Sequence, residues 1–219
     1  MTYVQRPWLK QYPADIPADL PGEYWRGKSA LDVFRHTAGS MPDAPAIHYF
    51  DSTMTFKDLD DLSDSLASAL QAGGIHPGDR VALVLQNVPA FPIAVYAIWK
   101  CGAIAVPCNP MLRQAELRSQ LSDSQASVLI CLESALLEAD PAARQAGVRR
   151  IISVGDGDFD APERDYIRHP ESRSIADDLL DLCDRFHNCK SARLDPGPQD
   201  IAYLVYTSGT TGPSKGSMN

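Results

Sequence analysis

Short apolar runs alternate with amphipathic stretches through the middle of this 219-residue chain, and this alternation restricts the fold most. Four runs have the length and β-branched content of buried strands, at residues 80–85, 103–106, 128–132 and 150–154. Three helical segments separate them, at residues 87–101, 113–121 and 133–146. Asn87 is expected to cap the first helix, and Pro141 is expected to break the last. Strict alternation predicts an α/β fold, with a mostly parallel sheet and helices on both faces.

Helix signals precede the alternating region. Ser29 is expected to cap one helix, and a strand is expected at residues 46–50. Thr55 and Asp58 form the pattern of a capping box, in which each side chain bonds the backbone of the other. Leucines recur at a helical spacing after this box, at Leu59, Leu62, Leu66 and Leu70. The pattern predicts a helix whose leucine face lies in the core.

Two regions flank the predicted domain core. Residues 1–28 are rich in proline and aromatic residues and show no period, so we predict an arm, with residues 29–219 as the domain. Residues 155–198 are long for a connection and predict a surface insertion. Within it we expect a solvated excursion at 155–170 and a helix at 174–186. Four acids fit the solvated face of that helix: Asp177, Asp178, Asp181 and Asp184.

Charge and hydropathy exclude several classes of function. The net charge is −8, and most of it comes from acidic residues between positions 156 and 184. No basic stripe is present, so nothing supports binding to nucleic acid or to an anionic membrane. Residues 81–99 carry no charge, but their prolines and amides favour a strand, a turn and a helix start over a transmembrane span. The first residues lack an apolar leader, which argues against secretion.

The five cysteines lack C-x-x-C spacing, and several lie in apolar runs. We therefore expect reduced, mostly packed thiols and a cytoplasmic protein. Cys183, His187 and Cys189 lie close together in sequence, but a zinc site needs a fourth ligand. No metal site is predicted within the chain.

Residues 200–216 are predicted to form a strand followed by a loop. The apolar and aromatic run that starts at Ile201 predicts a buried strand. Small, hydroxylated and flexible residues then begin at Thr207. Glycines let backbone N–H groups approach an anion, hydroxyls add donors, and Lys215 adds a positive charge. The candidate phosphate-binding residues are Thr207, Ser208, Gly209, Thr210, Thr211, Gly212 and Lys215.

Other loop types fail on spacing. A P-loop that uses Lys215 would place Ser214 at its second glycine and Gly216 at its magnesium-binding hydroxyl. A nucleophile elbow centred on Ser208 would need glycine where Tyr206 stands. A Ser-x-x-Lys pair would need serine at Gly212. No catalytic nucleophile is therefore assigned.

The run from residue 200 to residue 216 resembles the signature of the adenylate-forming (ANL) superfamily, which includes acyl-CoA synthetases, luciferases and peptide-synthetase adenylation domains. Residues 55–59 and 100–110 are similar to further family segments. The pattern looks most like a fatty acyl-CoA synthetase. The resemblance implies that a carboxylic acid and ATP form an acyl adenylate, which is transferred to CoA. It also implies that residues 207–212 hold the β- and γ-phosphates and that Lys215 neutralises the departing pyrophosphate.

The same resemblance predicts that parts of the enzyme are missing. The chain ends at Asn219, whereas family members continue through adenine-, Mg²⁺- and ribose-binding segments and a mobile C-terminal domain. We therefore expect an N-terminal portion that is inactive alone, cut short by design or by gene annotation. A homodimer is compatible with the resemblance. Two alternatives are a stand-alone nucleotide-binding or regulatory module, and a structural half that docks to a separate C-terminal partner.

Overall fold

The computed structural model describes residues 10–13, 16, 27–160, 175–189, 191–192, 194–207 and 215–219. A five-stranded sheet lies at its centre in the order β4-β3-β5-β6-β7, and all its strands pair in parallel. Its strands are β3 (Arg80–Val84), β4 (Ile104–Pro107), β5 (Val128–Leu132), β6 (Arg150–Val154) and β7 (Asp177–Asp178). The four strands predicted from the alternating pattern are confirmed.

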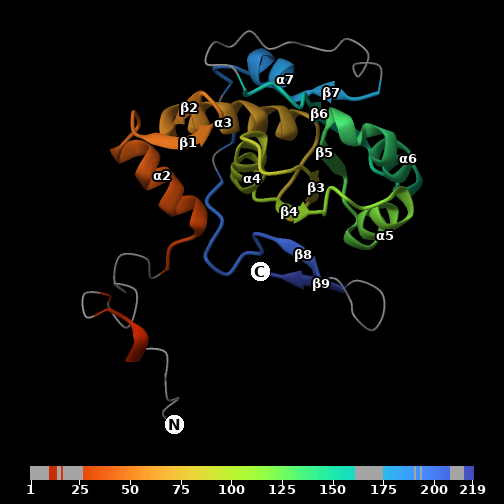
Figure 1. The fold of residues 1–219 in the computed structure, drawn as a ribbon, viewed down its shortest axis with the longest axis horizontal. Coiled ribbons are helices and arrows are strands. Elements are labelled where there is room, and N and C mark those ends of the chain that lie inside the picture. The colour runs from red at the N-terminus through yellow and green to blue at the C-terminus, as the bar shows by residue number, and fades with distance from the viewer. Residues whose placement is uncertain are drawn as a thin grey trace.

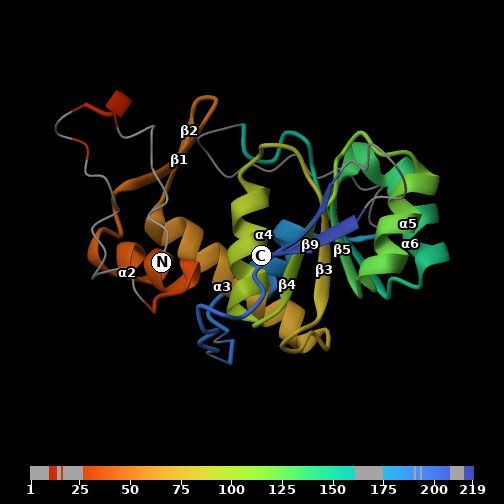
Figure 2. The same cartoon turned by 90° about the horizontal axis from the view of Figure 1, so that it is seen from below.

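Helices cover both faces of the sheet (Figure 2). One layer holds α3 (Phe56–Ala72), α4 (Ala90–Lys100) and α7 (Leu179–Arg185). The other holds α5 (Gln114–Ser124) and α6 (Leu136–Ala146). Successive residues of β3 point to opposite layers, so Val81 packs with the first layer and Ala82 with the second. The predicted α/β architecture is therefore confirmed.

The segment before the sheet begins with α2 (Ala30–Ser40) and a hairpin of β1 (Pro45–Tyr49) and β2 (Ser52–Thr55), shown in Figure 1. Ser29 and Thr55 cap α2 and α3, as predicted, and both form complete capping boxes, of which only the one at Thr55 was expected. The strand β2 was not expected. Its turn places Phe50 in the left-handed region at φ 46°, where glycine or asparagine is usual. Because an aromatic residue stands there, the sequence gives no signal for the turn.

Helices α4 and α6 differ from the prediction. Helix α4 begins at Ala90 and not after Asn87, because Val88 and the backbone before it form a turn in which Val88 N–H donates to Gln86 O. Pro141 was expected to break its helix, but α6 runs through it. The proline removes one backbone donor, whose partner would be the carbonyl of the surface residue Leu137.

The region predicted as an insertion contributes to the core. Its helix was expected at residues 174–186, but α7 starts at Leu179 because Asp177 and Asp178 form β7 beside β6. Asp177 accepts from Arg150 Nε at 2.6 Å, and Asp178 caps α7, so these two acids do not line a solvated helix face. Within the predicted solvated excursion, Phe159 is buried. Residues 161–174 lie outside the described residues, and the division into arm, domain and insertion stays a prediction.

A buried lysine joins the two main helices of the first layer. Lys100 of α4 is 2% exposed, and its Nζ lies 2.6 Å from Asp60 Oδ1 and 2.7 Å from Asp64 Oδ1 of α3. Nζ also donates to Ser63 Oγ at 2.9 Å and lies 5.6 Å from the centre of the Phe34 ring. A buried ammonium needs this number of partners, because an unpaired charge would be costly.

All five cysteines are unbridged, and only Cys189 is exposed, which confirms the prediction of mostly packed thiols. The uncharged run at residues 81–99 divides into β3 and α4, as expected. Within the described part of the chain, no helix is both long and apolar enough to cross a membrane.

Candidate functional site

The candidate site is carried by a hairpin of β8 (Leu204–Thr207) and β9 (Lys215–Met218), which pair antiparallel. The predicted strand exists, but it is not buried. Leu204 and Tyr206 pack toward the α5–α6 layer, whereas Val205 is 37% exposed and Thr207 is exposed. The aromatic and aliphatic run was interpreted as continuously buried, and the structure shows that its side chains alternate between core and solvent.

Two of the predicted phosphate-binding residues lie opposite each other. Thr207 pairs with Lys215 across the hairpin, and Thr207 Oγ1 donates to Lys215 O at 3.4 Å. Both residues are exposed. Lys215 was expected in the loop, but it begins β9, because its backbone pairs with β8. The remaining candidates lie outside the described residues: Ser208, Gly209, Thr210, Thr211 and Gly212.

Gly216 lets the two strands and their side chains approach closely. It pairs with Tyr206, and a Cβ built on it would lie 2.8 Å from Leu204 Cδ1 and 3.5 Å from Tyr206 Cζ. Any side chain here would therefore displace Leu204. This requirement explains the glycine directly after Lys215, which the loop chemistry alone did not.

The far end of β8 is bonded to helix α5. The Tyr206 hydroxyl donates to the Asp123 carboxylate, across 83 positions of sequence. Burial raises the pKa of Tyr206, and the bond to Asp123 raises it further, so the phenol keeps its proton well into the alkaline range. Sequence reasoning missed this pair because neither residue type signals such a distant contact.

The near end of the hairpin, residues 202 and 203 just before β8, is attached to α4 and to the edge of the sheet. Trp99 Nε1 donates to Ala202 O at 3.0 Å, and the Trp99 and Tyr203 rings meet edge to face at 5.2 Å. Ala105 of β4 also donates its N–H to Ala202 O, at 3.1 Å. One backbone bridge, between Ala105 and Tyr203, links the segment to the parallel sheet. The hairpin therefore extends from the edge strand β4 without becoming part of its ladder.

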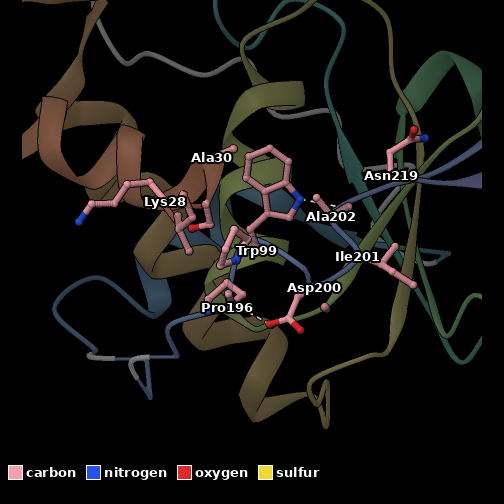
Figure 3. Close-up of a pocket in the computed structure, with 14 residues that line it drawn as sticks. Lys28, Ala30, Trp99, Pro196, Asp200, Ile201, Ala202 and Asn219 are labelled. Carbon is pink, nitrogen blue, oxygen red and sulfur yellow. Dashed lines mark hydrogen bonds between the residues drawn. The ribbon is translucent and has the colours of Figure 1, made fainter. Parts of the chain in front are cut away.

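A pocket of about 180 Å³ opens beside this near end, and Figure 3 shows Trp99 and Ala202 in its wall. Lys28 and Asp200 contribute charged side chains, and Pro196 contributes an apolar one. The pocket does not include Thr207 or Lys215. It is thus separate from the described part of the predicted phosphate-binding loop.

No group of three or more His, Cys, Asp or Glu side chains that could hold a metal ion occurs among the residues that the structure covers. Several acids discussed above have partners: Asp60 and Asp64 with Lys100, Asp123 with Tyr206, and Asp177 with Arg150.

Known structures that share this fold include acid–CoA ligases. An anthranilate CoA ligase in complex with anthranoyl-AMP matches 88% of the chain with a TM-score of 0.73 and 24% identity, which shows the fold; the match covers 34% of that protein. A long-chain-fatty-acid-CoA ligase from Archaeoglobus fulgidus matches 93% of the chain with a TM-score of 0.70 and 25% identity, over 39% of its length. The predicted superfamily fold is confirmed.

The AMP-binding enzyme family matches residues 34–219, and the chain belongs to this family. A long-chain-fatty-acid–CoA ligase of Escherichia coli O6:H1 is 31% identical over 98% of the chain, and one of Bacillus subtilis is 34% identical over 98% of it. In both cases the chain spans 40% of the length of the relative. The resemblance noted in the sequence is therefore confirmed.

Proposed function

We propose that this chain is part of an ATP-dependent acyl-CoA synthetase that activates a carboxylic acid, of the fatty-acid class, and transfers it to CoA. The observation that carries the proposal is the pairing of Thr207 with Lys215 in a chain of the AMP-binding family. The pairing holds a hydroxyl-bearing residue and a cationic residue at the two ends of the glycine- and threonine-rich loop. The long-chain-fatty-acid–CoA ligases among its relatives favour a fatty acid as the substrate.

The proposed reaction has two steps. The substrate carboxylate oxygen attacks the α-phosphorus of ATP, a new O–P bond forms, and the bond to pyrophosphate breaks. The CoA thiol then attacks the acyl carbon, and AMP leaves with the bonding electrons while the thiol loses its proton.

In the first step, negative charge grows on the departing pyrophosphate. We propose that residues 207–212 hold the β- and γ-phosphates and that Lys215 neutralises this charge. Donors already in place for the developing charge lower the barrier, because they need no reorganisation during the reaction.

Mg²⁺ commonly accompanies ATP in phosphoryl chemistry. The part of the chain described by the structure gathers no three potential ligands, and its acids near the hairpin have other partners. The family resemblance implies that the Mg²⁺ ligands lie outside these residues, and no role in the reaction is assigned to the ion.

We propose further that the 219-residue chain alone binds nucleotide phosphates without completing adenylation, because it spans only 40% of the length of its relatives. The unbridged cysteines support a cytoplasmic location.

Binding of ATP to the chain tests the phosphate-binding role directly. Lys215→Ala should weaken binding by about tenfold, the loss expected for one charge-assisted contact. The measurement is equilibrium dialysis with radiolabelled ATP. Lys57→Ala is the matched control, because Lys57 is an exposed lysine of α3 whose partner is Asp61. Equal affinity of the two variants would contradict the role of Lys215.

Release of pyrophosphate, dependent on ATP and a fatty acid, tests competence. We expect ATP binding without release, which separates the chain from a complete enzyme. Release above that of Lys215→Ala would show a working site and refute the proposed inactivity. Absence of ATP binding would refute the phosphate-binding role and favour a chain that only docks to a separate partner.

A further inference from the structure

We propose that Tyr206 is a positioning residue of the candidate site, and that its bond to Asp123 sets where the hairpin presents Thr207 and Lys215. The role of those two residues rests on the proposed phosphate-binding function. Tyr206 itself need not touch the nucleotide. It lies on the inner side of β8, while its neighbour Thr207 lies on the exposed side.

The attachments of the hairpin lead to this assignment. Its near end is fixed by Trp99 and by the backbone of Ala105, both of which bond Ala202 O. Among the described residues, β8 beyond Tyr203 has no ladder pairing with the five-stranded sheet and pairs with β9. The Tyr206–Asp123 bond is the attachment next to Thr207. Leu204 and the Tyr206 ring also pack against the α5–α6 layer, so loss of the bond would loosen the position of Thr207 without freeing the whole hairpin.

The Tyr206–Asp123 hydrogen bond is of a kind that can hold the hairpin in one position. A protonated phenol that donates to a carboxylate forms a charge-assisted hydrogen bond, which is stronger and more directional than a neutral one. Gly216 pairs with Tyr206 across the hairpin, so the strand pairing and the side-chain bond act on the same residue.

If the Tyr206–Asp123 bond mainly stabilised the core, its loss would lower the stability of the whole fold, but the packing of α5 argues against this. Leu117 and Leu121 attach α5 to the sheet from fully buried positions, so α5 does not need Asp123 for its own packing. Asp123 is a surface residue whose carboxylate water can solvate once the phenol is removed. Loss of the bond should therefore leave overall stability nearly unchanged and alter only the hairpin.

Hydrogen exchange, measured by mass spectrometry without any nucleotide, tests the attachment. Tyr206→Phe should speed exchange of the β8 and β9 amides by about tenfold, the loss expected for one bond to a charged group. Exchange in β3 and β5 should not change. Tyr203→Phe is the matched control: it removes a phenol hydroxyl from the same segment, and no hydrogen bond of that hydroxyl is seen among the described residues. Equal exchange in the two variants would overturn the proposal.

Binding of radiolabelled ATP tests the consequence for the site. Tyr206→Phe and Asp123→Ala should each weaken binding by about fivefold to tenfold, with melting temperatures close to that of the unchanged chain. The double variant should bind as weakly as either single one, because both changes remove the same bond. Multiplying losses, or unchanged affinity in Tyr206→Phe, would overturn the positioning role.

The two experiments distinguish a failure of the proposed function from a failure of the positioning role of Tyr206. If the unchanged chain does not bind ATP, the proposed function fails, and hydrogen exchange still decides whether Tyr206 fixes the hairpin. If ATP binds and Lys215→Ala weakens it while Tyr206→Phe does not, the function stands and the positioning role is refuted.

Discussion

The five-stranded sheet and the β8–β9 hairpin are built on opposite principles. In the sheet, β5 is buried at every residue and both faces are covered by helices. In the hairpin, β9 is exposed at every residue and β8 is at most half-buried. Burial of apolar surface supplies most of the free energy of folding, so the sheet should determine global stability. The hairpin can then be specialised for binding, since little of the fold depends on it.

The largest expected effect tests this division. Ile130→Ala in β5 should lower the free energy of unfolding by about 2–5 kcal/mol, because it removes a fully buried side chain and leaves a cavity. Val205→Ala in β8, at a residue 37% exposed, should cost less than about 1 kcal/mol. Urea unfolding of both variants gives the comparison. Similar losses would show that the hairpin is part of the cooperative core.

An intermediate effect is expected at alkaline pH. Burial raises the pKa of Cys131 from 9.0 to about 12. Between these values the unfolded chain releases the thiol proton while the folded chain retains it, so stability should fall as pH rises from 9 and should not depend on this thiol below 9.

One such thiol contributes at most about 1.4 kcal/mol per pH unit. Cys131→Ala should therefore show a shallower decline of unfolding free energy between pH 9 and pH 10.5 than the unchanged chain. The exposed Cys189 provides the control, and Cys189→Ala should keep the original slope. The same slope in both variants would mean that Cys131 ionises normally in the fold.

The smallest effect concerns the hairpin alone. Gly216→Ala would bring a Cβ within 2.8 Å of Leu204 Cδ1, and we expect hairpin opening to become easier by about 1 kcal/mol. Hydrogen exchange of β8 and β9 measures it, while urea unfolding should hardly change. Gly39→Ala in α2, where an added Cβ meets nothing within 4 Å, should be neutral or slightly stabilising. A global loss in Gly216→Ala would contradict the division between sheet and hairpin.

Local signals accounted for much of the fold. The apolar runs at β3 and β5, the cap at Ser29 and the capping box at Thr55 act over a few residues, so sequence alone located them. The turn at Phe50 escaped prediction because a bulky aromatic residue occupies a backbone conformation that usually selects glycine. Here the rest of the fold overrides the local preference.

The candidate site was predictable in composition but not in geometry. The order of small and hydroxylated residues pointed to Thr207 and Lys215, whereas their pairing depends on how the chain returns along β8. The Tyr206–Asp123 bond joins residues 83 positions apart, and no local pattern encodes such a contact. Exposure of Val205 was likewise hidden, because a run of apolar residues does not reveal that one side of its strand is left partly exposed.

The pairing of Thr207 with Lys215 also affects the entropy of binding. A free segment of this length would lose conformational entropy when its two ends are brought together around a ligand. Here the backbone hydrogen bonds of β8 and β9 bring those ends together when the chain folds. Any ligand that contacts both residues therefore meets them already at a fixed separation. Its affinity is therefore not reduced by the entropy of bringing these two residues together.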